Sequence, residues 1–219
     1  RLWTPHYNTP MQDDLLWVYE GLTQYYGYVI AARSGLWPAD FAREELALVA
    51  ATYDRRRPGR DWRPLEDTTH MPVINARRPQ PWSSWQRGED YYVEGALLWL
   101  DVDMRIREMS RGARTLDDFS RSFFATQATE GWVSLYELQD VVKGLDAVAS
   151  MDWYAFLRTR VATTRQPVLD GIERAGYRLV YSDKPNLSQS NAEKSSGRAD
   201  FGYSLGLVLS RDNVLTDVL

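Results

Sequence analysis

Glu20 is an isolated carboxylate in a long apolar and aromatic stretch near the start of the chain. It is the one charged residue between Leu15 and Ala32. The stretch contains no proline and is too long for a strand, so residues 15–36 predict a largely buried helix. The helical face that carries Glu20 is apolar and then small, which allows another group to approach it closely. A carboxylate there must be protonated, paired with an arginine from elsewhere in the chain, or bound to a metal.

A second candidate is the tyrosine pair Tyr91–Tyr92, which opens the helix predicted over residues 89–111. Glu89 and Asp90 are typical of a helix N-terminus, and Gly112 is typical of its end. By burial alone, two adjacent aromatic residues in such a helix are expected to lie in the core.

Two motifs resemble those of the glycyl aminopeptidase family of zinc metallopeptidases, which are gluzincins related to thermolysin and aminopeptidase N. W-V-Y-E-G-L-T-Q-Y-Y-G, residues 17–27, resembles the segment that carries the third zinc ligand of that family. Y-Y-x-x-G-A-L, residues 91–97, resembles the family's Y-Y-x-K-G-A-L, with Glu94 in place of the lysine. The resemblance implies that Glu20 binds the metal and that Tyr92 donates a hydrogen bond to the oxyanion of the tetrahedral intermediate.

The same resemblance implies an activity and a cofactor. The parent protein would be a zinc-dependent aminopeptidase that releases small N-terminal residues, Gly or Ala, from peptides. The chain contains two histidines, His6 and His70, and neither begins an H-E-x-x-H motif. One carboxylate does not make a zinc site. We therefore expect the chain to be inactive alone, with two partners: the missing N-terminal half of the catalytic domain and the peptide substrate.

Composition excludes several other classes. The formal net charge of the 219 residues is −4, which does not favour a nucleic-acid partner. The chain contains no cysteine, which excludes disulfides and thiolate metal sites. No run is long and apolar enough to span a membrane, so no membrane partner is expected. The compartment stays open between the periplasm and the cytoplasm of a bacterium, with the periplasm slightly favoured.

The expected fold is mainly α, the helical C-terminal subdomain of a thermolysin/aminopeptidase-N-like catalytic domain, with a short β segment at the C-terminus. Asp13 or Asp14 is expected to cap the first helix and Gly35 to end it. Further helices are predicted over 37–57, 119–124, 138–148, 151–161 and 167–175, two of them begun by capping boxes at 115–118 and 134–137, and a strand is predicted over 177–181.

The predicted domain organisation has three parts. Residues 1–182 form the helical half of a gluzincin catalytic domain without its H-E-x-x-H helix. Residues 183–199 are polar, without apolar periodicity, and predict a flexible linker. Residues 200–219 alternate like strands, with a turn at 211–213, and resemble the start of a truncated PDZ domain.

Two other classes of function stay open. Glu20 with Asp90, Glu94 or Asp103 could form the acid/base pair of a helical glycosidase, which needs two carboxylates roughly 5–10 Å apart across one cleft. Alternatively, the chain is a non-catalytic interaction module that docks through Trp62, Trp82 and Trp85, provided that these form one exposed patch.

The loop over residues 58–88 interleaves arginine with tryptophan, a pattern that also occurs in proteins that bind single-stranded nucleic acid. The net acidity favours arginine stacked on tryptophan instead. Asp101 and Asp103 are expected to pair with Arg105 and Arg107, or with arginines of this loop, and are given no catalytic role.

Overall fold

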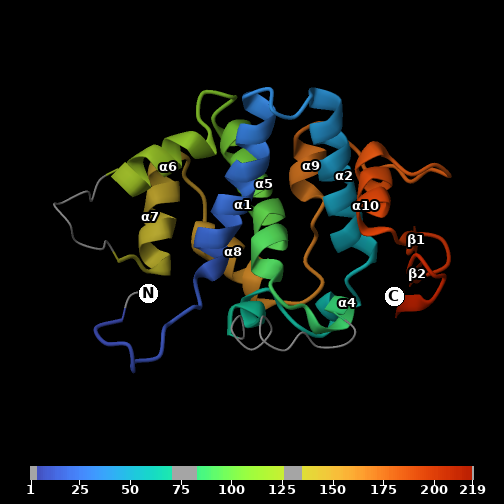
Figure 1. The fold of residues 1–219 in the computed structure, drawn as a ribbon. Coiled ribbons are helices and arrows are strands. Elements are labelled where there is room, and N and C mark those ends of the chain that lie inside the picture. The colour runs from blue at the N-terminus through green and yellow to red at the C-terminus, as the bar shows by residue number, and fades with distance from the viewer. Residues whose placement is uncertain (1–3, 71–82, 126–134, 219) are drawn as a thin grey trace.

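The computed structural model describes residues 4–70, 83–125 and 135–218. The fold is mostly helical, with a small antiparallel sheet at the C-terminal end, as the sequence predicts. Two long helices, α1 (Leu16–Arg33) and α5 (Asp90–Met109), run side by side through the middle of the molecule (Figure 1). Within the described ranges, no helix is long and apolar enough to cross a membrane.

Both central helices end at glycines in the left-handed region, with φ of 77° at Gly35 and 82° at Gly112. Glycine has no Cβ to clash in that conformation, so it ends a helix at little cost. The start of α1 differs from the expectation. The N-cap is Leu15, which has no capping side chain, and not Asp13 or Asp14. The reason is a backbone turn, in which the N–H of Leu16 donates to the carbonyl of Asp13 at 2.9 Å.

The two central helices cross in direct backbone contact at Gly21 and Gly95. A Cβ placed on Gly95 would lie 2.9 Å from the Cα of Gly21, closer than real side chains allow. One turn away, the indole N–H of Trp99 donates to the carbonyl of Trp17 at 3.1 Å, and the two rings stack with centroids 6.2 Å apart. The crossing is therefore fixed by shape and by a buried hydrogen bond.

Shorter helices flank this pair on both sides (Figure 1). On one side lie α6 (Leu116–Ala125), α7 (Leu138–Val148) and α8 (Trp153–Ala162), and on the other α2 (Ala39–Arg55), α9 (Asp170–Arg174) and α10 (Leu187–Ser196). The connection between α2 and α5 contains the 3-10 helices η1 (Pro58–Asp61) and η2 (Glu66–His70) and the short helix α4 (Ser83–Gln86).

The two predicted capping boxes have different outcomes. At the start of α6, the N–H of Thr115 donates to Oδ2 of Asp118 at 2.8 Å, as expected. At the start of α7, the N-cap is Glu137, and its N–H donates to Asp140 at 2.9 Å. The capping box therefore lies three residues later than predicted, and Ser134 lies outside the described residues.

The C-terminal segment corrects two expectations. Residues 177–181 form no strand, and the predicted linker 183–199 contains α10. The side chain of Asn186 caps α10 by accepting from the N–H of Gln189 at 2.8 Å, and its amide donates to the carbonyl of Glu44 on α2 at 2.8 Å. Gly197, with φ 67°, ends the helix. These end signals and the contact with α2 stabilise a helix that lacks an apolar stripe.

A three-stranded antiparallel sheet follows, in the order β1-β2-β3, with β1 (Ala199–Phe201), β2 (Leu207–Leu209) and β3 (Leu215–Val218). The turn between β2 and β3 includes Asn213 at φ 57°, in the region predicted from the sequence. The assignment of residues 200–219 to a PDZ-like domain stays a prediction.

Candidate functional site

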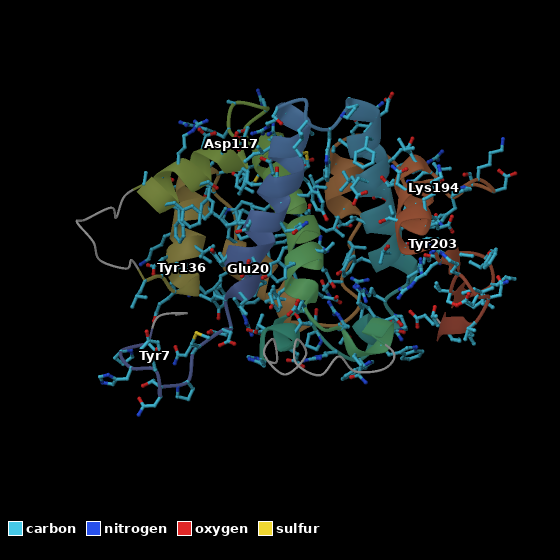
Figure 2. The ribbon with its side chains drawn as sticks, viewed as in Figure 1. Tyr7, Glu20, Asp117, Tyr136, Lys194 and Tyr203 are labelled. Atoms are coloured by element: carbon cyan, nitrogen blue, oxygen red, sulfur yellow. The ribbon has the colours of Figure 1, made fainter. Side chains whose placement is uncertain are left out.

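Glu20 lies in the second turn of α1 and is partly buried. Within the described residues it forms no ion pair with an arginine or lysine, unlike most carboxylates of the central helices. The charge of Glu20 also acts on Tyr136, which lies just before α7. Burial first, and then Tyr19 and Glu20, raise the pKa of Tyr136 to about 12. Figure 2 labels Glu20 on α1 and Tyr136 beside α7, next to each other in this view. The arginine-paired alternative for Glu20 therefore finds no support in this part of the chain.

The phenol of Tyr92, in the first turn of α5, faces this carboxylate. Burial, then hydrogen bonding to Glu20 and the charge of Glu20, raise the pKa of Tyr92 to about 12. The phenol therefore stays protonated at neutral pH and has an O–H to donate. Its neighbour Tyr91 is 3% exposed and packs against the Tyr92 ring with centroids 4.9 Å apart. The core interpretation is thus correct for Tyr91, while Tyr92 lies at the edge of the core beside Glu20.

The glycine crossing explains why these two side chains meet. Glu20 immediately precedes Gly21, and Tyr92 lies three residues before Gly95 on α5. Because the two glycines touch, the residue before one and the residue one turn before the other are brought together. That Glu20 and Tyr92 share one site was predicted from the motifs, but the contact between Gly21 and Gly95 was not, although both glycines lie inside those motifs.

Asp101 and Asp103 are paired as the sequence predicts. Asp103 accepts from Nε of Arg107 at 2.9 Å and from the phenol of Tyr25 at 2.8 Å. Asp101 pairs with Arg105 at 3.2 Å, and also with Arg160 and Arg174. Both carboxylates are buried and engaged, so they are structural.

Three arginines of the 58–88 loop, Arg60, Arg63 and Arg87, are buried. They bind carboxylates and backbone carbonyls, rather than stacking on the described tryptophans as expected. Arg87 binds both Asp90 and Glu94, so these carboxylates are engaged as well. Arg77 and Arg78 lie outside the described residues.

A metal site would need further ligands beside Glu20. Among the described residues, no group of three or more His, Cys, Asp or Glu side chains is placed to hold a metal ion. His6 and His70 are both exposed. His70 lies near Asp13, whose pKa is raised by burial and lowered by the charge of this histidine. The donor set therefore fits a single carboxylate ligand and not a complete site.

Two comparisons with known proteins bear on this arrangement. A search of curated proteins finds no match. A scan against protein-family models matches residues 1–98 to M61 glycyl aminopeptidase. The match includes Glu20, Tyr92 and the glycines of the helix crossing, and it ends within α5. Residues 1–98 of this chain, slightly less than half of its length, are thus similar to the M61 glycyl aminopeptidase family, the peptidase family that the two motifs resemble.

Proposed function

We propose that this chain supplies one metal ligand, Glu20, and one oxyanion donor, Tyr92, to a zinc-dependent aminopeptidase that removes small N-terminal residues such as Gly and Ala. One observation carries the proposal. Across the α1–α5 crossing, the Tyr92 phenol faces a carboxylate that has no cationic partner among the described residues. The family match to a peptidase supports the reaction class.

The residues present define how much of the site this chain can provide. A glutamate oxygen is a normal zinc ligand, but a catalytic zinc site uses three protein ligands and keeps one position open. When bound, zinc polarises the scissile carbonyl and activates a water molecule. The H-E-x-x-H ligands are absent from these 219 residues, so the chain alone provides a partial site and is inactive.

Tyr92 performs its role as a neutral hydrogen-bond donor. Because its pKa is about 12, the phenol keeps its proton throughout the physiological range. A preorganised O–H directed at developing negative charge stabilises a tetrahedral intermediate more than it stabilises the planar ground state. Tyr91 cannot take this role because its ring is buried in the core.

The test uses both the chain and the longer enzyme that would include it. The purified chain should not hydrolyse a glycyl-anilide substrate, with or without added zinc. The longer enzyme, with an upstream H-E-x-x-H segment, should hydrolyse it and stop when zinc is chelated. In that enzyme Tyr92→Phe should lower kcat about 10²–10³-fold with little change in KM.

The exposed tyrosine of α8 provides a control, since Tyr154→Phe lies outside the site and should leave both constants unchanged. Chelator-sensitive hydrolysis by the chain alone would overturn the proposed division of the zinc site. An unchanged kcat in Tyr92→Phe would overturn the role of the phenol.

The structure bears differently on the two alternatives. The glycosidase partners considered for Glu20, namely Asp90, Glu94 and Asp103, are all bound to arginines, which disfavours that alternative. Trp62 and Trp85 are 56% and 46% exposed, and the indole of Trp62 donates to the carbonyl of Trp85. This exposure is what the interaction-module alternative predicts for these two residues; Trp82 lies outside the described residues.

A further inference from the structure

The first turn of α5 has two faces with different chemistry. Asp90 and Glu94 are four residues apart, so they share one face of the helix, and both are buried. Tyr92 lies about 200° around the helix from Asp90, nearly opposite, and faces Glu20. A group that holds Asp90 and Glu94 therefore holds the back of the turn whose front carries the Tyr92 phenol.

Arg87 is that group. It is 1% exposed, and its guanidinium has three separate partners. Its Nε donates to Oδ2 of Asp90 at 2.8 Å, and its Nη2 donates to Oε2 of Glu94. Its Nη1 donates to the carbonyl of Arg63 at 2.6 Å. One planar side chain thus ties two successive turns of α5 to the loop beneath them.

The surroundings leave Arg87 little freedom to move. Glu94 uses its second oxygen to pair with Nε of Arg60 at 3.2 Å. The stem of Arg87 packs on Gly59, where an added Cβ would lie 2.6 Å from the Arg87 Cγ. The backbone of Arg87 has φ 53°, which turns the chain sharply from α4 into α5. The arginine is therefore fixed from the stem to the guanidinium.

Tyr92 is less buried than Asp90 and Glu94 on the opposite face of the helix. Its side chain is only partly buried, and the groups of the described residues that act on it are Glu20 and Tyr19 on α1, Glu89 at the N-cap of α5, and Tyr91. None of these is a cation that could fix the ring from the front. The direction of the phenol therefore depends on the placement of the first turn of α5.

We propose that Arg87 is a positioning residue for the Tyr92 phenol, which it aligns with Glu20 by clasping Asp90 and Glu94 on the back of the helix. This inference rests on the proposed function for its catalytic meaning. Its structural content, that Arg87 sets where the phenol lies, can be tested without zinc and without turnover.

The test compares Arg87→Met and Arg87→Lys with a matched pair of substitutions at Arg160, which binds the middle of α5. Arg160 is also buried, at 8% exposed, and it pairs with Asp101 of α5 at 2.5 Å and with Asp170 at 2.6 Å. Arg160→Met and Arg160→Lys disrupt a comparable set of buried ion pairs, whose α5 partner, Asp101, lies more than two helical turns along α5 from Tyr92. Urea unfolding of each variant reports the loss of stability that any buried ion pair would show.

The discriminating measurement is the set of nuclear Overhauser contacts between the Tyr92 ring and the side chains of Tyr19 and Glu20, at neutral pH in the isolated chain. We expect these contacts to weaken at least about twofold in both Arg87 variants and to stay unchanged in both Arg160 variants. Arg87→Lys keeps the charge but cannot reach three partners at once. If Arg87→Met does not fold, Arg87→Lys alone is compared with the Arg160 variants.

Two outcomes would overturn the proposal. One is that the Tyr92 contacts persist in a folded Arg87 variant. The other is that they weaken equally in the Arg160 variants, since that would show a general loosening of α5. A failure of the proposed function would appear elsewhere, as an active chain or as a Tyr92→Phe enzyme with normal kcat. The two failures are therefore distinguishable.

Discussion

Two glutamates on the central helices lie in opposite electrostatic environments. Glu94 is 5% exposed and bound by Arg87 and Arg60. Even with these cations, burial is the largest influence on its carboxyl and raises its pKa. Glu20 is less buried and has no cationic partner within the described residues. The fold therefore pairs one carboxylate with buried arginines and leaves the other without a cationic partner among the described residues.

This contrast predicts different effects for the same substitution. Glu20→Gln should change the free energy of unfolding by no more than about 0.5 kcal/mol, because no ion pair is lost. Glu94→Gln should cost about 3 kcal/mol, because Arg60 would lose its carboxylate partner in the interior and Arg87 would keep only Asp90. Urea unfolding of the two variants at neutral pH measures both values. Equal losses would mean that Glu20 is structural, which would remove the basis for its proposed role as a metal ligand.

At the residue scale, local spacing could be predicted from the sequence, and long-range partners could not. The pairs of Asp101 with Arg105 and of Asp103 with Arg107 follow from their i, i+4 spacing on one helix. Arg160, which also binds Asp101, comes from 59 residues away, and nothing in its neighbourhood indicates the pairing. The motifs indicated Glu20 and Tyr92, but the binding of Asp90 and Glu94 by Arg87 behind Tyr92 is visible only in the three-dimensional structure.

At the scale of elements, the site depends on the close approach of α1 and α5. Most helix bounds could be predicted, because apolar periodicity and end signals are local properties of the sequence. For example, α7 spans Leu138–Val148 as predicted. The helix crossing could not be predicted, because a glycine that touches another helix has the same local sequence pattern as one that faces solvent. Helix α10 was missed for a related reason, since its stability comes from its caps and from α2.

The crossing leads to a prediction with an internal control. Gly21→Ala adds a Cβ that would lie 3.1 Å from the backbone of Gly95 and from the Trp99 ring. The helices would have to separate, so we expect a loss of about 1–3 kcal/mol in the free energy of unfolding. Gly27→Ala lies on the same helix with nothing within 4 Å of the added Cβ. It should stabilise the protein by up to about 1 kcal/mol through helix propensity.

Thermal or urea unfolding of the two alanine variants gives the comparison directly. In Gly21→Ala, the nuclear Overhauser contacts between Tyr92 and Glu20 should also weaken, because the same crossing brings these residues together. If Gly21→Ala proved as stable as Gly27→Ala, the close contact of the two helices would not exist in solution.

At the scale of the whole molecule, α2 connects the C-terminal sheet to the central helices. Arg56 at its end pairs with Asp200 of β1 at 2.5 Å, and its guanidinium lies over the Tyr203 ring at 4.9 Å. The next residue, Arg57, lies 3.8 Å from Asp90 of α5 and over the Tyr53 ring. The sheet therefore docks on the helical part through partly buried charges, which composition alone could not indicate because both partners belong to polar segments.

Tyrosines whose pKa is raised by the fold predict how the stability of the protein depends on pH. Burial is the largest cause that raises the pKa of Tyr26, Tyr92, Tyr136 and Tyr181 to about 12, above the ordinary value of 10.0. In the unfolded chain these phenols lose their protons first, so the unfolded state binds fewer protons between pH 10 and 12. The stabilisation is complete below pH 10 and is lost as the pH rises towards 12.

Urea unfolding at pH 9, 10 and 11 should therefore show a free energy of unfolding that falls with each step above pH 10. The double variant Tyr26→Phe/Tyr136→Phe should flatten this decline, because it removes two of the shifted groups from α1 and from the start of α7. Tyr154→Phe, at an exposed position, should leave the slope unchanged. A decline of the same slope in all three proteins would show that groups other than these phenols set the alkaline limit of the fold.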